Sequence, residues 1–311
     1  MSRALVLGID GGGTSTKAWL AEDPGPVIGR GQAGPSNVKS IGPEAARAAL
    51  DLAISRSFDD AGLGRCPVDV ACLGLAGFDR PAEKQLLEKW SDDCGWAHRL
   101  VLVNDGDLVV AAGTLDGWGV GVIAGTGSIA VGRSKTGQSA RSGGWGYLIG
   151  DEGSGYAVAL AGLRKVARRA DGRESPPKPD PLTSRICEQF AIADPSGLVA
   201  ALYRTDFDRA RIAGLAPIVV EASRADRSIF TEILEPSGIE LARMVVAVAH
   251  QIGIDQGPLP LAKAGSFLLK CSEVSRVLDD QLGLQGFEVH SQVVTDPAEG
   301  AIILARRAFF S

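Results

Sequence analysis

The chain has 311 residues, of which 45% are hydrophobic and 22% charged, and its formal net charge is −5. This is an ordinary globular composition with room for one large or two medium domains, and it contains no apolar run long enough to span a membrane. A net negative charge without a basic stripe argues against nucleic acid as the main partner.

The cysteines and histidines are scattered through the sequence. The five cysteines are odd in number and form no C-x-x-C motif, and the three histidines lie far apart. Neither a zinc site nor an iron–sulfur site is therefore expected. The first residues, 1–7, run straight into a predicted strand without the apolar core of a signal peptide. The sequence predicts a cytoplasmic protein with free thiols.

The first glycine cluster follows a predicted strand. The apolar run 4–9 ends in Asp10-Gly11-Gly12-Gly13-Thr14, and strand character resumes at Ala18. This pattern predicts a tight hairpin with a carboxylate at its turn. Three consecutive glycines allow positive φ and expose amides that can bind phosphate, although a plain glycine turn is the alternative. A Walker P-loop is excluded, because Thr14 stands where its lysine is required and no helix follows.

The segments up to residue 113 alternate strands and helices. A third strand is predicted over 27–32, and Asn37 beyond it reads by itself as an ordinary turn residue. The further elements expected are a helix from Pro43 that stops at Gly62, a strand over 68–75 ending in Ala76-Gly77, a helix over 82–90, a strand over 100–103 and a short helix to Gly113. This βββαβαβα order predicts a compact α/β unit with polar groups at its strand ends, where open sheets bind ligands.

The stretch 120–155 holds the densest glycine clusters. A strand pattern at 120–123 leads into Gly125-Thr126-Gly127-Ser128, and two further clusters are Gly143-Gly144-Trp145-Gly146 and Gly150-Asp151-Glu152-Gly153-Ser154. Glycines around single polar residues let the backbone approach a ligand, while amides and hydroxyls donate to phosphate or sugar oxygens. The first cluster fits the dinucleotide fingerprint, but a second strand over 129–132 follows it instead of a helix. A hairpin is therefore predicted, and a Rossmann site is disfavoured.

The remainder is mainly helical up to residue 255. A helix is expected over 155–169, a proline-rich surface loop over 171–181, and helices over 182–255 with a kink or split at Glu235-Pro236. The last expected elements are a strand over 259–264 that ends in Gly265-Ser266-Phe267, a helix over 272–282, a strand over 287–289 and a helix over 297–309. The second half thus repeats the strand-then-helix theme with a large helical insert.

Taken in order, these motifs resemble those of the N-acetylglucosamine kinases. More broadly they resemble the family that joins these enzymes to glucosamine kinases and to the ATPase activators of acyl-CoA dehydratases and reductases. That family belongs to the superfamily of acetate kinase, sugar kinases, heat-shock chaperones and actin. The resemblance implies an α/β fold of two related ribonuclease H-like (actin-like ATPase) domains that close on ATP. They would span residues 1–113 and 114–311, with the helical insert in the second and the last helix, about 297–309, packing back on the first.

The resemblance also implies roles for single residues. Asp10 would hold Mg²⁺ through water, and Asp105 matches the catalytic base. The positions that match ATP contacts are Gly11, Gly12, Gly13, Thr14, Gly125, Thr126, Gly127, Gly214, Gly265 and Ser266. The positions that match sugar contacts are Asn37, Asp105, Ser128, Gly144, Trp145, Gly146 and Asp151.

Phosphoryl transfer asks a protein mainly to align donor and acceptor and to neutralise developing charge, which fits these residue types. A carboxylate within reach of the sugar hydroxyl would serve as general base, the role assigned to Asp105. An N-cap role is the structural alternative for Asp105. Asp107 is a second carboxylate nearby, but Asp105 follows the strand more directly. For Trp145 the alternative is a core aromatic residue.

The sequence therefore favours an ATP-dependent kinase that phosphorylates the 6-hydroxyl of an amino sugar, with N-acetylglucosamine first among the candidates. Glucosamine, N-acetylmannosamine and N-acetylmuramic acid stay open as alternatives. ATP, Mg²⁺ and a small sugar are the expected ligands, with no nucleic acid and no membrane, and a homodimer is common among relatives. The other function considered is an ATPase activator of a redox enzyme, but the cysteines lack the placement that a shared iron–sulfur cluster would need.

Overall fold

The computed structural model describes residues 4–75, 81–203 and 208–310. The chain divides into two compact units, which we call unit 1 (residues 1–118 and 294–311) and unit 2 (residues 119–293). The C-terminal segment thus belongs to the same unit as the N-terminus. The predicted Ala76-Gly77 strand end lies outside the described residues.

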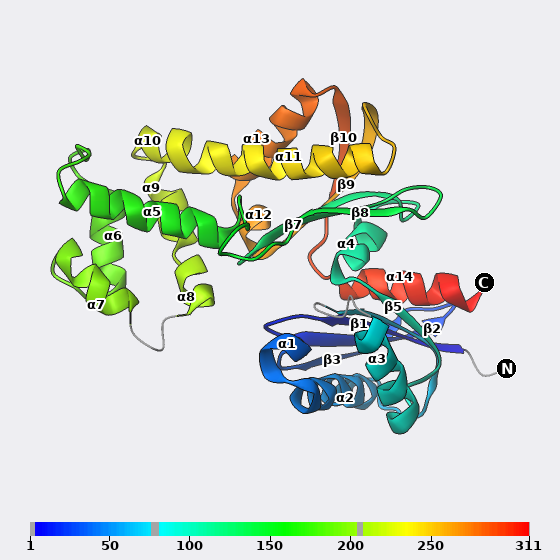
Figure 1. The fold of residues 1–311 in the computed structure, drawn as a ribbon. Coiled ribbons are helices and arrows are strands. Elements are labelled where there is room, and N and C mark those ends of the chain that lie inside the picture. Colours follow the sequence, from blue (N-terminus) through cyan, green and yellow to red (C-terminus); the bar gives the residue numbers. More distant parts are fainter. Residues whose placement is uncertain (1–3, 76–80, 204–207, 311) are drawn as a thin grey trace. The chain divides into compact units, whose positions relative to one another are not determined.

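Unit 1 is built on a five-stranded mixed sheet (Figure 1). Its strands are β1 (Ala4–Gly11), β2 (Thr16–Asp23), β3 (Val27–Ala33), β4 (Val68–Leu75) and β5 (Ala97–Val103), in the order β3-β2-β1-β4-β5. Its helices are α1 (Val38–Ile41), α2 (Pro43–Asp60), α3 (Pro81–Cys94), α4 (Asp105–Gly113) and α14 (Ala298–Phe309). The first three strands are antiparallel, and β4 and β5 run parallel to β1. The predicted first hairpin and the βββαβαβα order are confirmed.

The alternation of side chains along β1 gives unit 1 two cores. Leu7 and Ile9 are buried in one cluster with Leu50 of α2. Val6 is buried in a second cluster with Leu108 of α4 and Ala301 of α14. Successive residues of a strand point to opposite faces, so helices must cover both faces of this sheet.

Unit 2 repeats the same topology. Its strands are β6 (Gly119–Ala124), β7 (Ser128–Arg133), β8 (Ser139–Gly143), β9 (Gly257–Ala264) and β10 (Phe287–Val293), in the order β10-β9-β6-β7-β8. β6 to β8 form the antiparallel part and β9 and β10 the parallel part, as β1 to β3 and β4 to β5 do in unit 1. The predicted fold of two related α/β domains is confirmed. β8 was not predicted, because its sequence, SARSG, has only one apolar residue.

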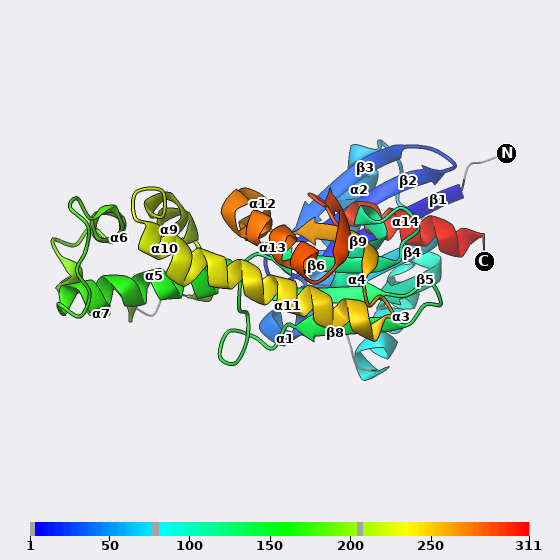
Figure 2. The same ribbon diagram turned by 90° about the horizontal axis from the view of Figure 1, so that it is seen from above.

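The helices of unit 2 lie mostly between β8 and β9, as the predicted insert requires. They are α5 (Gly155–Ala170), α6 (Pro181–Gln189), α7 (Leu198–Leu202), α8 (Arg209–Ala213), α9 (Ala216–Ala222), α10 (Arg227–Ile229) and α11 (Glu235–Gln251), followed after β9 by α12 (Ser266–Lys270) and α13 (Ser272–Leu284). α11 packs on β6, β7 and β8 and against α13 (Figure 2). The expected break near Pro236 takes the form of a π-helical turn, Phe230–Leu234, because proline lacks the N–H that a regular α-helix would use.

Two buried cations of α5 tie the insert together. Lys165 bonds Glu232 at 2.7 Å and Glu174 at 3.0 Å, and its side chain is 2% exposed. Arg169 bonds Asp180 at 2.7 Å and also pairs with Asp226. The bonds to Glu174 and Asp180 hold the segment over 171–181 on α5, and removing either acceptor would cost a buried cation one of its partners.

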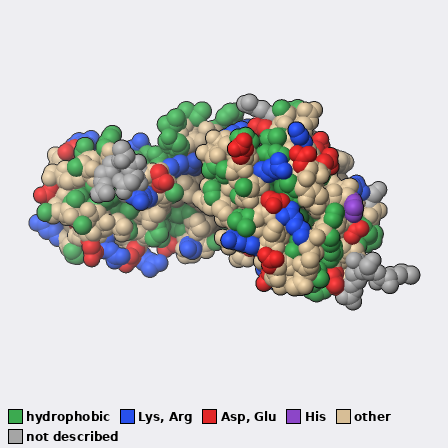
Figure 3. Space-filling view, turned by 90° about the horizontal axis from the view of Figure 1, so that it is seen from below, with side chains coloured by type: hydrophobic (Ala, Val, Ile, Leu, Met, Phe, Trp, Pro, Cys, Tyr) green, Lys and Arg blue, Asp and Glu red, His purple; other side chains and the backbone are tan. Residues whose placement is uncertain are grey.

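The surface and the thiols complete the picture. On the face drawn in Figure 3, acidic and basic side chains are interspersed over the surface. Among the described helices, none is both long and apolar enough to cross a bilayer. All five cysteines are free, and burial raises the pKa of the Cys72 thiol to about 12.

We expect Gly300→Ala to destabilise unit 1. Gly300 of α14 lies so close to α4 that a Cβ atom would sit 2.0 Å from the carbonyl oxygen of Leu108. Because the backbone of α4 cannot move aside as a flexible side chain can, the variant should lose about 1–3 kcal/mol in its free energy of unfolding. Chemical denaturation would measure this loss. The matched control is Gly283→Ala, in the exposed end of α13, where a Cβ meets open space. It should be neutral or stabilising by up to about 1 kcal/mol, and equal losses in both variants would contradict this packing.

Candidate functional site

The first glycine turn closes the β1–β2 hairpin. The Gly12 N–H donates to the Ser15 carbonyl at 3.0 Å, and Gly13 and Thr14 are exposed. Gly11 is buried, and a Cβ there would lie 2.4 Å from the Ser36 Oγ, so a larger residue does not fit. Gly13 and Thr14 are thus accessible at this turn, as binding of a phosphate would require.

Carboxylates gather at the same end of the unit 1 sheet. Asp10 is half-buried in β1, and burial together with the like charges of Asp105 and Asp296 raises its pKa to about 7, while Lys17 lowers it. The Lys17 Nζ donates to the Asp296 Oδ2 at 2.8 Å. The sequence pointed to Asp10 and Asp105 but not to Lys17 or Asp296. An Asp-Pro pair before a helix marked only the start of α14.

The cluster of Asp10, Asp105 and Asp296 is suited to bind a hydrated divalent cation. The carboxylates repel one another, which raises the pKa of Asp10, and a cation bound nearby would reduce this repulsion. Within the described ranges, no three His, Cys, Asp or Glu side chains are arranged to hold a metal ion directly. Mg²⁺ usually keeps several waters and binds one or two carboxylates plus the phosphates of its nucleotide, so a water-mediated role for Asp10 is compatible with this geometry.

Asp105 and Asp107 have different surroundings at the start of α4. The N-cap is Asn104, whose side chain accepts from the Gly106 N–H at 3.1 Å, so the N-cap interpretation of Asp105 is wrong. The Asp107 Oδ2 accepts from the Asn104 N–H at 3.2 Å and completes a capping box. Asp105 is half-buried, and its Oδ1 accepts from the Gly106 N–H at 3.0 Å. Asp107 therefore stabilises the helix start, whereas Asp105 lies in the group with Asp10.

Asn37 begins α1, a four-residue helix that the sequence did not predict. Its Oδ1 accepts from the Lys39 N–H at 3.0 Å. Asn37 thus acts as an N-cap rather than as a simple turn residue. This bond uses its side-chain oxygen and not the NH₂ group.

In unit 2, four hydrogen bonds join the Gly125–Ser128 turn to the segment 144–155. The Gly144 N–H donates to the Ser128 carbonyl at 3.0 Å, and the Gly155 N–H donates to the Gly125 carbonyl at 2.8 Å. The Ser128 N–H donates to the Asp151 Oδ1 at 3.2 Å, and its Oγ donates to the Glu152 carbonyl at 2.5 Å. The structure therefore brings Gly125, Ser128, Gly144 and Asp151 into one cluster.

Asp151 is the most constrained residue of this cluster. It has a φ of 64°, which is rare outside glycine, and it is 3% exposed. Its Oδ2 accepts from the Arg209 Nη2 at 2.5 Å. Arg209 was not predicted from the sequence, because it lies in the helical insert and carries no motif.

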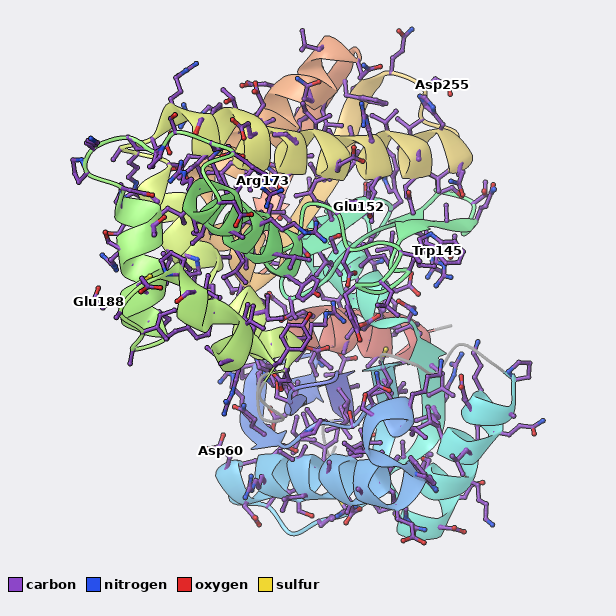
Figure 4. The ribbon with its side chains drawn as sticks, turned by 60° about the vertical axis from the view of Figure 1, so that its left-hand side comes forward. Asp60, Trp145, Glu152, Arg173, Glu188 and Asp255 are labelled. Carbon is purple, nitrogen blue, oxygen red and sulfur yellow. The ribbon has the colours of Figure 1, made fainter. Side chains whose placement is uncertain are left out.

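Trp145 does not belong to the core. Its side chain is 66% exposed, so the core interpretation is wrong (Figure 4). The flanking Gly144 and Gly146 have φ values of 70° and 83°, which explains why glycine occupies both positions. The loop therefore holds an indole ring at the surface of unit 2.

A pocket of about 520 Å³ lies in unit 2 beside the second glycine turn. Gly125, Thr126 and Gly155 line one part of it, and Gly214 and Ser266 line another. Gly265 does not line the pocket but lies against the end of β6, with a φ of 93° and space too small for a Cβ next to the Ala124 carbonyl. Four positions that the resemblance assigned to ATP, Gly125, Thr126, Gly214 and Ser266, thus share one pocket, whose size suits a nucleoside.

Two sheets of the same topology, each with a glycine turn after its first strand, define an α/β fold of two related domains. The fold is shared with a ROK hexokinase from Thermus thermophilus, at a TM-score of 0.58 and 16% identity over 98% of this chain and 99% of that one. Residues 7–305 match the BadF/BadG/BcrA/BcrD ATPase family, and the chain belongs to this family.

Several proteins resemble this chain over nearly its whole length. It is 30% identical to an N-acetylmuramic acid/N-acetylglucosamine kinase of Clostridium acetobutylicum, over 97% of this chain and 98% of that protein. It is also 30% identical to an N-acetyl-D-glucosamine kinase of Dictyostelium discoideum, over 98% of each. The solved structure of a putative N-acetylglucosamine kinase from Chromobacterium violaceum has a TM-score of 0.76 and 27% identity over 98% of this chain and 100% of that one.

Proposed function

We propose that this protein transfers the γ-phosphoryl group of ATP to the 6-hydroxyl group of an amino sugar, with N-acetylglucosamine as the preferred acceptor. The observation that carries the proposal is the cluster of Ser128, Gly144 and Asp151, which shares the Gly125–Ser128 turn with the nucleoside-sized pocket. A polar loop and a nucleotide pocket that meet at one glycine turn suit a reaction between a sugar and ATP. The activities assigned to the relatives support the same acceptor class.

On the donor side, we assign phosphate binding to the two glycine turns. Gly13 and Thr14 present an exposed turn, and Thr126 and Gly125 line the pocket that would take the nucleoside. Asp10 would hold Mg²⁺ through water, and the ion would neutralise charge on the phosphates. The role of the protein here is to align the donor and to balance its charge.

On the acceptor side, we assign Asp105 as the general base. Its carboxylate would accept the proton of the sugar hydroxyl while the hydroxyl oxygen forms its bond to phosphorus and the bond to ADP breaks. The NH₂ group of Asn37 and the carboxylate of Asp151 would orient the sugar ring. Because Asp151 is buried and already bonded, it can accept from a hydroxyl only in a narrow range of geometries, which favours specificity.

We expect Asp10→Asn to stabilise the metal-free protein while it impairs catalysis. The folded-state pKa of Asp10, about 7, lies above its ordinary value of 3.8. The folded protein therefore favours the neutral form of Asp10. The contribution of this group to the free energy of unfolding is fully present below pH 3.8 and is lost as the pH rises through 7. The variant is neutral at every pH, so its Tm in chelator should exceed that of the wild type at pH 8 but not at pH 4.

The same variant should need more Mg²⁺ for half-maximal activity and should have a lower kcat. Asp59→Asn, an exposed carboxylate in the last turn of α2, is the control and should change neither property. Thermal unfolding with and without Mg²⁺, together with a Mg²⁺ titration of activity, measures both effects. Full activity of the wild type in excess chelator would remove this role for Asp10.

A coupled assay of ADP release over a panel of sugars tests the proposed function. The panel holds N-acetylglucosamine, glucosamine, N-acetylmannosamine, N-acetylmuramic acid and glucose, with a sample that contains no sugar. We expect sugar-dependent ADP release with the highest kcat/KM for N-acetylglucosamine. A higher kcat/KM for glucosamine would reassign the substrate. ADP release that no sugar accelerates would favour the ATPase activators of the family instead.

A further inference from the structure

Arg209 lies where the nucleotide pocket and the polar cluster of unit 2 meet. It is the first residue of α8, and its guanidinium bonds the buried Asp151 carboxylate at 2.5 Å. Its own side chain stays 35% exposed. A guanidinium has five N–H donors, and this bond uses one of them, so donors are left for a ligand.

The guanidinium is also held against the second glycine turn. A Cβ on Gly127 would lie 2.5 Å from the Arg209 Nη2 and 2.7 Å from the Asp151 Oδ1. The rings of Tyr147 and Tyr156 lie 5.4 and 5.9 Å from the guanidinium carbon. A carboxylate, two aromatic faces and a glycine backbone thus fix the charge in position, because arginine stacks on rings while it donates in its plane.

Residues that follow Arg209 in the chain reach the pocket. Ala210, Ala213 and Gly214 line it together with Gly125 and Thr126. Arg209 is therefore placed between a wall of the pocket and Asp151, over the turn that joins them. A nucleotide in the pocket and a sugar at Asp151, as proposed above, would both lie beside this turn.

We propose that Arg209 is a further catalytic residue, whose guanidinium contacts the phosphoryl group during its transfer. This inference rests on the proposed function. Charge spreads over the equatorial oxygens of the group as the bond to ADP breaks and the bond to the sugar oxygen forms. Arg209 supplies a fixed positive charge at the transition state, while the proton of the sugar hydroxyl goes to Asp105. The bond to Asp151 holds the guanidinium in place before the substrates arrive.

The test compares Arg209→Gln and Arg209→Lys with Arg211→Gln. Arg211 lies on the same short helix but does not line the pocket, so its variant matches the loss of charge. We expect Arg209→Gln to lower kcat by about 10²-fold or more, the loss that follows removal of a transition-state donor. Arg209→Lys keeps the charge without the planar fork and should lose at least about tenfold. Arg211→Gln should stay within about twofold of the wild type, as surface substitutions usually do.

A binding measurement keeps the inference testable apart from turnover. Calorimetry would compare ADP with a non-hydrolysable ATP analogue, which differ by the terminal phosphoryl group. We expect the wild type to bind the analogue more tightly than ADP, and Arg209→Gln to lose most of that difference while ADP affinity hardly changes. Arg209→Lys should lie between the two, and it serves where Arg209→Gln fails to fold.

Two results would overturn the inference. If Arg209→Gln keeps kcat and raises only the KM of the sugar, Arg209 merely positions Asp151. If it keeps the preference for the ATP analogue over ADP, the guanidinium does not contact the terminal phosphoryl group. The binding comparison needs no sugar, so it decides the role of Arg209 even if the wild type phosphorylates no sugar, a result that would count against the proposed function alone.

Discussion

Asp105→Asn should lower kcat by about 10²-fold or more and leave the affinity for the sugar within about tenfold. The amide keeps the size and the hydrogen bond of the side chain at the start of α4 but cannot accept the proton of the sugar hydroxyl. The carboxylate shares the end of the unit 1 sheet with Asp10, whose pKa it raises, so it lies where a base close to a bound cation is needed. Steady-state kinetics and a separate titration of the sugar measure the two quantities.

Asp107→Asn is the matched control for this prediction. Asp107 belongs to the capping box of α4, so its variant should lose about 0.5–2 kcal/mol of stability and keep most of its kcat. The opposite pattern, with kcat lost in Asp107→Asn and kept in Asp105→Asn, would show that the base has been misassigned.

Asp151→Ala should lower kcat/KM for the sugar by about 10²-fold or more, while the affinity for ATP changes little. The substitution removes a buried acceptor that the Ser128 N–H and Arg209 hold in place, and a site built for a polar contact discriminates sharply when that contact is missing. In the wild type, N-acetylglucosamine should also be a better substrate than glucose.

Glu152→Ala is the control for Asp151→Ala. The Glu152 side chain is exposed, and the bond that this residue gives to Ser128 comes from its backbone carbonyl, which the substitution preserves. Its kinetics should match those of the wild type. If Asp151→Ala weakens ATP binding and spares the sugar, or if glucose matches N-acetylglucosamine, the acceptor half of the assignment is wrong.

Much of this fold could be predicted because local patterns agree with the tertiary structure. Apolar runs that end in glycine turns gave the β1–β2 and β6–β7 hairpins, and the stop at Gly62 matched its φ of 67°. The strand β8 was not predicted, because its partner β7 supplies its hydrogen bonds while its own residues are mostly polar. A strand that is buried on both faces has an apolar sequence, whereas a strand paired at the edge of a sheet has little sequence pattern by which to recognise it.

The polar partners of the site residues were not predicted for a different reason. Lys17 and Asp296 are 279 residues apart in the sequence, and Asp151 and Arg209 are 58 residues apart. Neither pair belongs to a local motif, and only the fold brings its members together. Motifs such as Gly125–Ser128 could be located because the chain itself sets the geometry of the turn, but the charges that surround a turn depend on tertiary contacts.

The proposed reaction moves phosphorus from ATP to the 6-hydroxyl of an amino sugar. Its most direct test is two-dimensional ¹H–³¹P NMR of the product formed from ATP and N-acetylglucosamine by the wild type, with Asp105→Asn in parallel. We expect a phosphorus resonance coupled to the protons on C6, formed in step with ADP and almost absent with the variant. Release of free phosphate without a sugar phosphate, or coupling to the proton on another ring carbon, would contradict it.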